Sequence, residues 1–365
     1  MSGASWHRQW VRTARGPGGH LLRGLLWLAS LVYAVAMRWR NAAFRRGRRA
    51  IHRLTIPVVS VGNLTVGGTG KTPLVAWLAQ WLANRGVRVV IVSRGYGARP
   101  GQPNDEAREL ADRLPQVPHL QQADRVAAGQ RAIQRYDAQC LVLDDAFQHR
   151  RLHRDLDIVL LDALDPFGGD YLLPRGLLRE PLSSLARAAV LVLTRADLVD
   201  EATRLAIRDR ALAHAPHAVW LEAGLAPGEL LRHEHPPAHV RLLAGRPVAA
   251  FCGIGNPTGF RRTLQACGLQ VVHWREFPDH HDYPQADQDE LTRWAASLSD
   301  VSAIVCTHKD WVKLSQSSLG PHPLYALTVS LDWRTDPAPL LARLSAWIPE
   351  SPLPAEPDQP LGPQA

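Results

Sequence analysis

The first 104 residues of the sequence contain no aspartate or glutamate, and Asp105 is the first acidic residue of the chain. The same stretch holds 16 lysines and arginines, whereas the remainder holds 26 basic and 34 acidic residues. The net charge of +8 therefore combines a strongly basic front with a mildly acidic remainder. A basic front favours an anionic partner, such as phosphate groups, an anionic membrane surface or a nucleic acid. An arginine-rich composition without such a partner is the alternative.

Cysteine is also scarce, with four residues in 365, and none has the spacing of a metal or redox motif. This excludes a disulfide scaffold and indicates reduced cysteines in a cytosolic compartment. The apolar content of 46% is that of a globular protein and excludes one that crosses a membrane many times. The length predicts two domains, each large enough for its own core.

Only residues 21–37 form a long apolar run, LLRGLLWLASLVYAVAM, and the arginine-rich stretch RWRNAAFRRGRRAIHR follows it directly. Seventeen residues are the lower limit for crossing a bilayer, and Arg23 interrupts the run. We therefore predict a helix that lies in or dips into the cytoplasmic face of a membrane, with its arginines on anionic headgroups. A signal peptide and the buried first helix of a soluble protein are the alternatives. The basic stretch opposes translocation and so disfavours the signal peptide.

A glycine-rich loop follows the apolar stretch Ile56–Val61, in the sequence IPVVSVGNLTVGGTGKT. A strand, such a loop and a Lys-Thr pair that opens a helix are typical of a P-loop, although an ordinary glycine-rich turn is the alternative. We expect the glycines to leave room for backbone N–H groups around phosphates, Lys71 to reach the β- and γ-phosphates, and Thr72 to ligate Mg²⁺. The residues expected to bind the nucleotide are Thr65, which replaces the usual first glycine, Val66, Gly67, Gly68, Thr69, Gly70, Lys71 and Thr72.

Further apolar stretches predict more parallel strands at residues 87–92, 140–143, 158–161 and 190–193. The fold class is therefore α/β, with a P-loop NTPase-type parallel sheet flanked by helices. Asp144 and Asp145 end one strand and would hold Mg²⁺ opposite Thr72. Arg94 and Arg99 follow another strand at the edge where such sheets bind ligands, although a plain turn with solvated arginines is equally consistent.

Six segments occur in the order seen in one enzyme family: VGNLTVGGTGKTP, SRGYG, LDDAFQHRRL, LLREPLSSL, FPDHHDY and THKDWVKL. In these the chain resembles the tetraacyldisaccharide 4′-kinases, the lipid A kinases of Gram-negative bacteria, from the apolar helix to about residue 345. The resemblance implies transfer of the γ-phosphate of ATP, with Mg²⁺, to the 4′-hydroxyl of a tetraacyldisaccharide 1-phosphate, giving lipid IVA. It implies an acylated disaccharide phosphate and the cytoplasmic face of the inner membrane as partners. We expect a monomer and no nucleic-acid partner.

The resemblance also implies roles for single residues. Asp105 matches the catalytic base, His280 matches its histidine partner, and Lys71 completes the catalytic set. The residues implied on the metal side are Thr72, Asp144, Asp145, Glu106 and Glu180. Those implied near substrate or phosphates are Arg94, Arg125, Gln148, His149 and Arg179. The sequence departs from the family pattern at Asn104 and Ala146, where glycine is usual, and at His308, where glutamate is usual.

The resemblance also implies a smaller α/β domain in the second half, with strands at 247–252 and 303–306. The expected organisation is a membrane-associated arm at 1–53, a P-loop kinase domain at 54–215, a connector and smaller domain at 216–350, and a disordered tail at 351–365. A P-loop GTPase acting as a switch or metallochaperone is the main alternative, because the turn at 194–197, TRAD, is similar to a guanine-recognition turn. A nucleic-acid-dependent ATPase would explain the basic front, but no aromatic-interleaved binding surface supports it.

Overall fold

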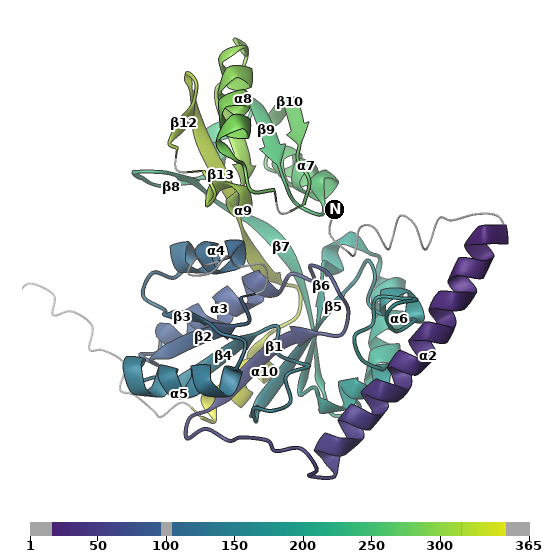
Figure 1. Ribbon diagram of the computed structural model, residues 1–365. Coiled ribbons are helices and arrows are strands. Elements are labelled where there is room, and N and C mark those ends of the chain that lie inside the picture. The colour runs from purple at the N-terminus through teal and green to yellow at the C-terminus, as the bar shows by residue number, and fades with distance from the viewer. Residues whose placement is uncertain (1–16, 96–103, 280, 315, 348–365) are drawn as a thin grey trace, which may run out of the picture.

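The computed structural model describes residues 17–95, 104–279, 281–314 and 316–347, which form two lobes joined by two long strands (Figure 1). The first lobe contains β1 (Val58–Asn63), β2 (Val89–Ser93), β3 (His119–Gln121), β4 (Cys140–Asp144), β5 (Leu156–Asp162) and β6 (Val190–Thr194). They pair in the order β6-β5-β1-β4-β2-β3, and every pair is parallel. The predicted parallel sheet is confirmed, with β1 at its centre, so that the loop after β1 starts from the middle of the sheet.

The second lobe continues the same sheet. Its strands are β7 (Val219–Arg232), β8 (His235–His239), β9 (Pro247–Cys252), β10 (Gln270–Glu276), β11 (Ala303–Thr307), β12 (Ser318–Leu319) and β13 (His322–Trp333). The first residues of β7 pair with β6 in parallel, and the following residues pair with β13 in antiparallel orientation. The strand order continues from β6 as β7-β13-β11-β9-β10. The two lobes are therefore joined by one continuous sheet and not by a flexible linker.

The stretch after residue 216, which is rich in proline and histidine, was expected to begin as a connector. It forms instead the 14-residue strand β7 and its hairpin partner β8. Pro227 is accommodated where the pairing of β7 with β13 shifts register, between Leu327 and Val329. A proline at such an irregularity costs little, because the missing N–H is not needed in the regular ladder.

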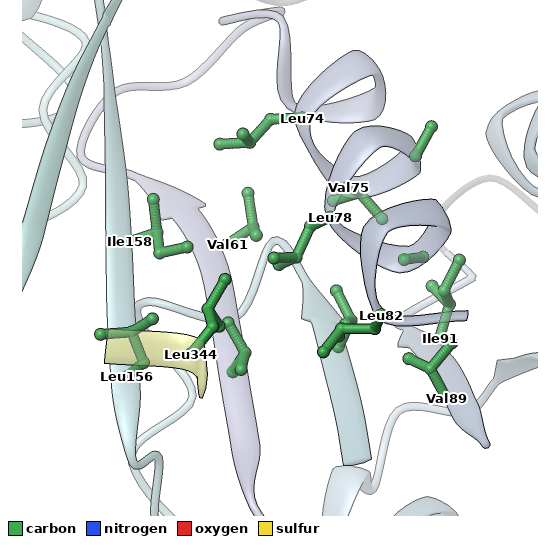
Figure 2. Close-up of a cluster of buried hydrophobic side chains, with 14 of the residues drawn as sticks. Val61, Leu74, Val75, Leu78, Leu82, Val89, Ile91, Leu156, Ile158 and Leu344 are labelled. Carbon is green, nitrogen blue, oxygen red and sulfur yellow. The ribbon is translucent and has the colours of Figure 1, made fainter. Parts of the chain in front are cut away.

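The helices are α2 (Pro17–Arg45), α3 (Lys71–Ala83), α4 (Asp105–Arg113), α5 (Arg125–Tyr136), α6 (Glu201–Leu212), α7 (Pro257–Ala266), α8 (Gln285–Ala296), α9 (His308–Trp311) and α10 (Ala338–Ser345). Helix α3 confirms the predicted helix after the P-loop. Its Leu74, Leu78 and Leu82 lie along one face and pack against the strands, as Figure 2 shows. This packing attaches the helix that follows the P-loop firmly to the sheet.

The C-terminal helix α10 returns to the first lobe. Leu340 and Leu344 are buried in the same cluster as Val61 and Leu78, and Figure 2 shows Leu344 beside Leu156. The domain boundaries predicted from the sequence placed residues 216–350 in one unit. In the structure, however, α10 packs on the P-loop lobe. The reason is that β13 runs back along β7, so that the chain leaves the second lobe before α10 begins. The expected tail at 351–365 lies outside the described residues.

Helix α2 carries a mostly exposed apolar surface along one side of the molecule (Figure 1). Within the described ranges it is the one helix long and apolar enough to cross a membrane, and only 6% of its most apolar window is buried. Leu25, Val32, Val35 and Trp39 are all exposed. A buried first helix of a soluble protein is therefore not what the chain forms.

Strand β1 and the loop after β4 approach each other at Gly62. A Cβ at Gly62 would lie 2.6 Å from the Cβ and 2.8 Å from the backbone N of the fully buried Phe147. We expect Gly62→Ala to displace the loop that carries Asp144 and Asp145, lowering the free energy of unfolding by about 1–3 kcal/mol, the usual cost of overpacking. Urea unfolding and ATP-dependent activity should both report the loss. Gly24→Ala, where a Cβ would meet nothing within 4 Å, is the control, and equal stability of the two variants would contradict the close approach.

Candidate active site

The loop after β1 has the backbone of a phosphate cradle. Gly67 has φ 123°, and Gly70, the residue before α3, has φ 77° and ψ 29°. Side chains other than hydrogen disfavour both conformations. At Gly68, by contrast, a Cβ would meet no protein atom within 4 Å. The loop delivers the chain to the N-terminus of α3, where backbone N–H groups and the helix dipole favour an anion.

The turn after β6 holds the glycine-rich loop in place. Thr194 Oγ1 donates to the carbonyl of Thr69 at 2.8 Å, and Arg195 Nη2 donates to the carbonyl of Gly68 at 3.1 Å. A second nitrogen of Arg195 forms an ion pair with Asp162 at the end of β5. This is the TRAD turn that suggested guanine recognition, but its arginine binds the P-loop backbone. No local pattern in the sequence indicates this role, because the contact joins residues more than 120 positions apart.

Thr65, the residue that replaces the usual first glycine, is buried at the start of the loop. Its carbonyl accepts a hydrogen bond from Asn63 Nδ2 at 2.8 Å, and it bridges Leu178 in antiparallel orientation. The next residue, Val66, donates to the carbonyl of Leu177 at 2.8 Å. The loop is therefore fixed at its first residues by the segment around 177–178, and a side chain at 65 is part of that junction.

Lys71 lies between Asn63 and the acidic pair. Its Nζ donates to Asn63 Oδ1 at 3.3 Å and lies 3.6 Å from Asp145 Oδ1. Arg179 Nη1 binds both oxygens of Asp145, at 3.0 and 2.9 Å. Burial alone would raise the pKa of Asp145, but the two cations lower it. The structure thus brings three of the expected site residues, Lys71, Asp145 and Arg179, into direct contact.

Asp144 is the last residue of β4 and is only 3% exposed. Burial, and next the nearby Glu106, raise its pKa to about 7, while Lys71 opposes the shift. Its Oδ1 is buried without a hydrogen-bond partner among the described residues. A cation at this oxygen would satisfy it, and Thr72 at the start of α3 is a second hard oxygen donor.

These donors fit Mg²⁺ rather than a metal held by the protein alone. Mg²⁺ prefers oxygen ligands and usually keeps several waters beside one or two carboxylates and the phosphates of its substrate. The described part of the chain contains no cluster of three or more His, Cys, Asp or Glu side chains that could hold a metal. Thr72 and Asp144, with Asp145 beside them, would hold the ion, and Glu106 lies close enough to act on Asp144.

Glu180 does not face this metal side. It is completely buried, and its two oxygens accept hydrogen bonds from Arg187 at 2.8 Å, Asn41 at 3.3 Å and Arg40 at 3.4 Å. Burial would raise its pKa, yet Arg187 and the surrounding donors lower it. Two of these donors belong to α2. The expectation that Glu180 ligates the metal is therefore corrected: its carboxylate is bound by the N-terminal helix and the segment at 184–187.

The candidate base Asp105 begins α4 and is held from the second lobe. Its Oδ2 lies 2.8 Å from Lys313 Nζ, which also donates to the carbonyl of His281 at 2.7 Å. Burial would lower the pKa of Lys309, but four nearby carboxylates, Asp279 and Asp105 among them, raise it. Asp279 and the backbone of His281 thus lie near the lysines that contact Asp105 and its helix. His280 itself lies outside the described residues, so its pairing with Asp105 stays a prediction.

Arg125, His149 and Arg94 form a basic cluster beside the acidic pair. Burial lowers the pKa of Arg125, while Asp145 and Asp144 raise it, and its Nε has no hydrogen-bond partner in the described ranges. Burial and the neighbouring arginines lower the pKa of His149 to about 4. Arg94 is exposed at the end of β2 and also acts on Arg125. Arg99 lies outside the described residues.

Gln148 contacts both the end of β1 and Arg179. Its Nε2 donates to the carbonyl of Asn63 at 2.8 Å, and its Oε1 accepts from Arg179 at 3.4 Å. Both polar ends of the Gln148 side chain are therefore used to connect the end of β1 with the loop after β4. Its expected contact with substrate stays a prediction.

The structure shows the surroundings of the three residues that depart from the family pattern. Asn104 caps α4 by accepting from the backbone N of Ala107 at 3.0 Å, and thereby orients the helix that begins with Asp105. Ala146 is fully buried. His308 is buried in α9 with its Nε2 2.7 Å from Asp112 Oδ2, so it docks the second lobe on α4.

Comparison with known proteins decides the family. A sequence model described as tetraacyldisaccharide-1-P 4′-kinase matches residues 22–348. The chain belongs to the tetraacyldisaccharide 4′-kinase family. A protein of that name from Anaeromyxobacter dehalogenans (strain 2CP-C) is 42% identical over 326 residues, which cover 84% of this chain and 85% of the relative. One from Geobacter sulfurreducens is 38% identical over 347 residues, covering 90% and 94%.

The family also has a solved structure similar to this one. The crystal structure of the "apo" form of LpxK from Aquifex aeolicus in complex with ATP has a TM-score of 0.70 and 30% sequence identity. The similarity covers 89% of this chain and 99% of that chain. The resemblance predicted from six sequence segments is therefore confirmed, as is the P-loop fold of a kinase family.

Proposed function

We propose that this chain transfers the γ-phosphate of ATP to the 4′-hydroxyl of a tetraacyldisaccharide 1-phosphate in lipid A biosynthesis, giving lipid IVA. One observation carries the proposal. The acidic pair at the end of β4 lies within electrostatic reach of both Lys71 of the P-loop and Glu106 in the first turn of α4. Family membership and the ATP complex of a relative support it. In the TRAD turn, which suggested the GTPase alternative, Arg195 binds the P-loop backbone.

The donor side follows from the P-loop geometry. The loop N–H groups and the N-terminus of α3 bind the phosphates, and Lys71 neutralises charge that develops on them. At 3.6 Å its ion pair with Asp145 is long, so Nζ can move to a phosphate oxygen while Arg179 keeps Asp145 paired. Mg²⁺, when bound, supplies further charge neutralisation on the phosphates. Thr72 and Asp144 would hold it.

The acceptor side depends on Asp105. During transfer the sugar oxygen forms a bond to the γ-phosphorus, the bond from that phosphorus to the bridging oxygen breaks, and the hydroxyl proton goes to a carboxylate. Asp105 is the carboxylate that we assign to this step. Lys313 holds it from the second lobe at 2.8 Å. The contact between the two lobes at this ion pair therefore places the base.

The location follows from the acylated substrate, which stays in the bilayer, so that the enzyme must reach the membrane surface. The exposed apolar face of α2, followed by arginines, suits the cytoplasmic face of the inner membrane. The monomeric state and the lack of a nucleic-acid partner stay predictions from the sequence.

Phosphorylation of the lipid tests the proposal. The purified full-length chain, mixed with vesicles containing the tetraacyldisaccharide 1-phosphate, Mg²⁺ and γ-labelled ATP, should transfer label to the lipid, and chelation of Mg²⁺ should stop the transfer. ATP hydrolysis without any labelled lipid would overturn the proposal.

A further inference from the structure

We propose that α2 positions residues of the active site in addition to contacting the membrane. Tyr33, Arg40 and Asn41 of α2 are positioning residues that hold the two segments carrying Gln148 and Arg179, and the buried Glu180 is their common anchor. The proposal rests on the kinase function proposed above. It assigns roles to side chains of α2 that face the protein and not the lipid.

The anchor is a carboxylate with no access to water. Arg40 and Asn41 of α2 supply two of its donors, and Arg187 supplies a third. Asn41 also donates to Ser184 Oγ at 3.3 Å. A buried charge is tolerated only while it is paired, and removing partners from one is strongly unfavourable. Lifting α2 from the body would strip Glu180 of two donors, so the position of α2 and that of residues 179–187 are tightly linked.

Two further contacts connect α2 to backbone in the same two segments, and a third joins an arginine side chain of one segment to the backbone of α2. The hydroxyl of Tyr33 donates to the carbonyl of Arg179 at 2.9 Å. Arg40 Nη2 donates to the carbonyl of Gln148. In the reverse direction, Arg150 Nη1 donates to the carbonyl of Asn41 at 3.1 Å. Contacts to backbone fix the path of each segment irrespective of its side chains.

The side chains of the held residues lead directly to the reacting groups. Arg179 binds both oxygens of Asp145. Gln148 donates to the carbonyl of Asn63, and the Asn63 side chain accepts from Lys71. One residue thus separates α2 from the metal-side carboxylate, and two separate it from the P-loop lysine. α2 also carries the exposed apolar face. The helix that contacts the membrane is therefore the same helix that holds the two catalytic segments in position.

Tyr33→Phe is the sharpest test, because it removes one hydroxyl and keeps the ring. Loss of one hydrogen bond of about 0.5–1.5 kcal/mol corresponds to a fall in kcat of about two- to tenfold. We expect that fall with unchanged KM for ATP and unchanged binding to vesicles. Hydrogen exchange should become faster in residues 144–150 and 176–187. Tyr136→Phe, at the end of α5, should leave kcat and exchange as in the unmodified protein.

Glu180→Gln separates a positioning residue from a metal ligand. We expect kcat to fall while the Mg²⁺ concentration for half-maximal rate stays the same, whereas loss of a metal ligand would raise that concentration. A raised Mg²⁺ requirement, or Tyr33→Phe with unchanged kcat and unchanged exchange, would overturn the inference. The exchange measurement needs no activity, so it remains informative even if the unmodified chain fails to phosphorylate the lipid, which would refute the proposed function instead.

Discussion

Replacing Lys71 by alanine is expected to lower kcat at least about 10³-fold, the scale of losing a cation that stabilises a transferring phosphoryl group. Nζ lies 3.3 Å from Asn63 Oδ1 and 3.6 Å from Asp145 Oδ1, at the end of the glycine-rich loop. From this position the ammonium group of Lys71 can turn from the acidic pair to the phosphates. Initial rates of lipid phosphorylation at saturating ATP measure the effect.

Two controls accompany the Lys71 variant. Arg88→Ala removes a surface cation whose partner is the exposed Asp137, and it should leave the rate within about twofold because exposed pairs contribute little. Thermal unfolding should show that Lys71→Ala folds, since Arg179 still pairs with Asp145. A folded Lys71→Ala enzyme that keeps a tenth or more of the normal kcat would contradict the role given to this lysine.

Asp105→Asn is expected to lower kcat by about 10²–10⁴-fold, the usual contribution of a general base. Asparagine has nearly the same shape and can still accept from Lys313, so the change removes basicity more than geometry. ATP affinity should be nearly unchanged, because the P-loop and the metal-side residues are intact. Single-turnover rates with saturating ATP, measured from pH 5 to 9, provide the test.

A matched control lies on the same helix. Asp112→Asn alters the partner of His308 at the other end of α4, so it changes the docking of the lobes without touching the base. It should reduce the rate far less than Asp105→Asn. If both variants lose activity equally, or if Asp105→Asn keeps full activity, then Asp105 acts through the position of α4 or plays no part in proton transfer.

The first lobe could be predicted from the sequence because the patterns that indicate its strands and turns each lie within a short stretch of the chain. Apolar stretches such as Val89–Ser93, glycine at the turns and Asp144 at a strand end are visible without knowledge of distant partners. The P-loop and the acidic pair were predicted in the same way, and the structure brings Lys71 and Asp145 together. Order along the chain and the rules for parallel sheets suffice for this much.

Other features depend on contacts between distant residues. Nothing in residues 216–240 indicates that β7 pairs with β13, about 100 positions later. Likewise, the return of α10 to the first lobe depends on the path of β13. Glu180 was assigned to the metal by resemblance, but its donors Arg40 and Asn41 lie about 140 residues earlier, where no local pattern points to them. The spacing of Lys309 and Lys313 by one helical turn was a usable indication of two cations facing α4, and it was missed.

The most direct measurement gives the purified full-length chain γ-labelled ATP and GTP side by side, with Mg²⁺ and vesicles containing the tetraacyldisaccharide 1-phosphate. The position of the new phosphate on the lipid is then determined by NMR. We expect ATP to label the 4′-oxygen, and Lys71→Ala and Asp105→Asn to lower the rate of labelling at least about 10²-fold. Hydrolysis of GTP with no phosphate on the lipid, or phosphate on another hydroxyl, would contradict this expectation.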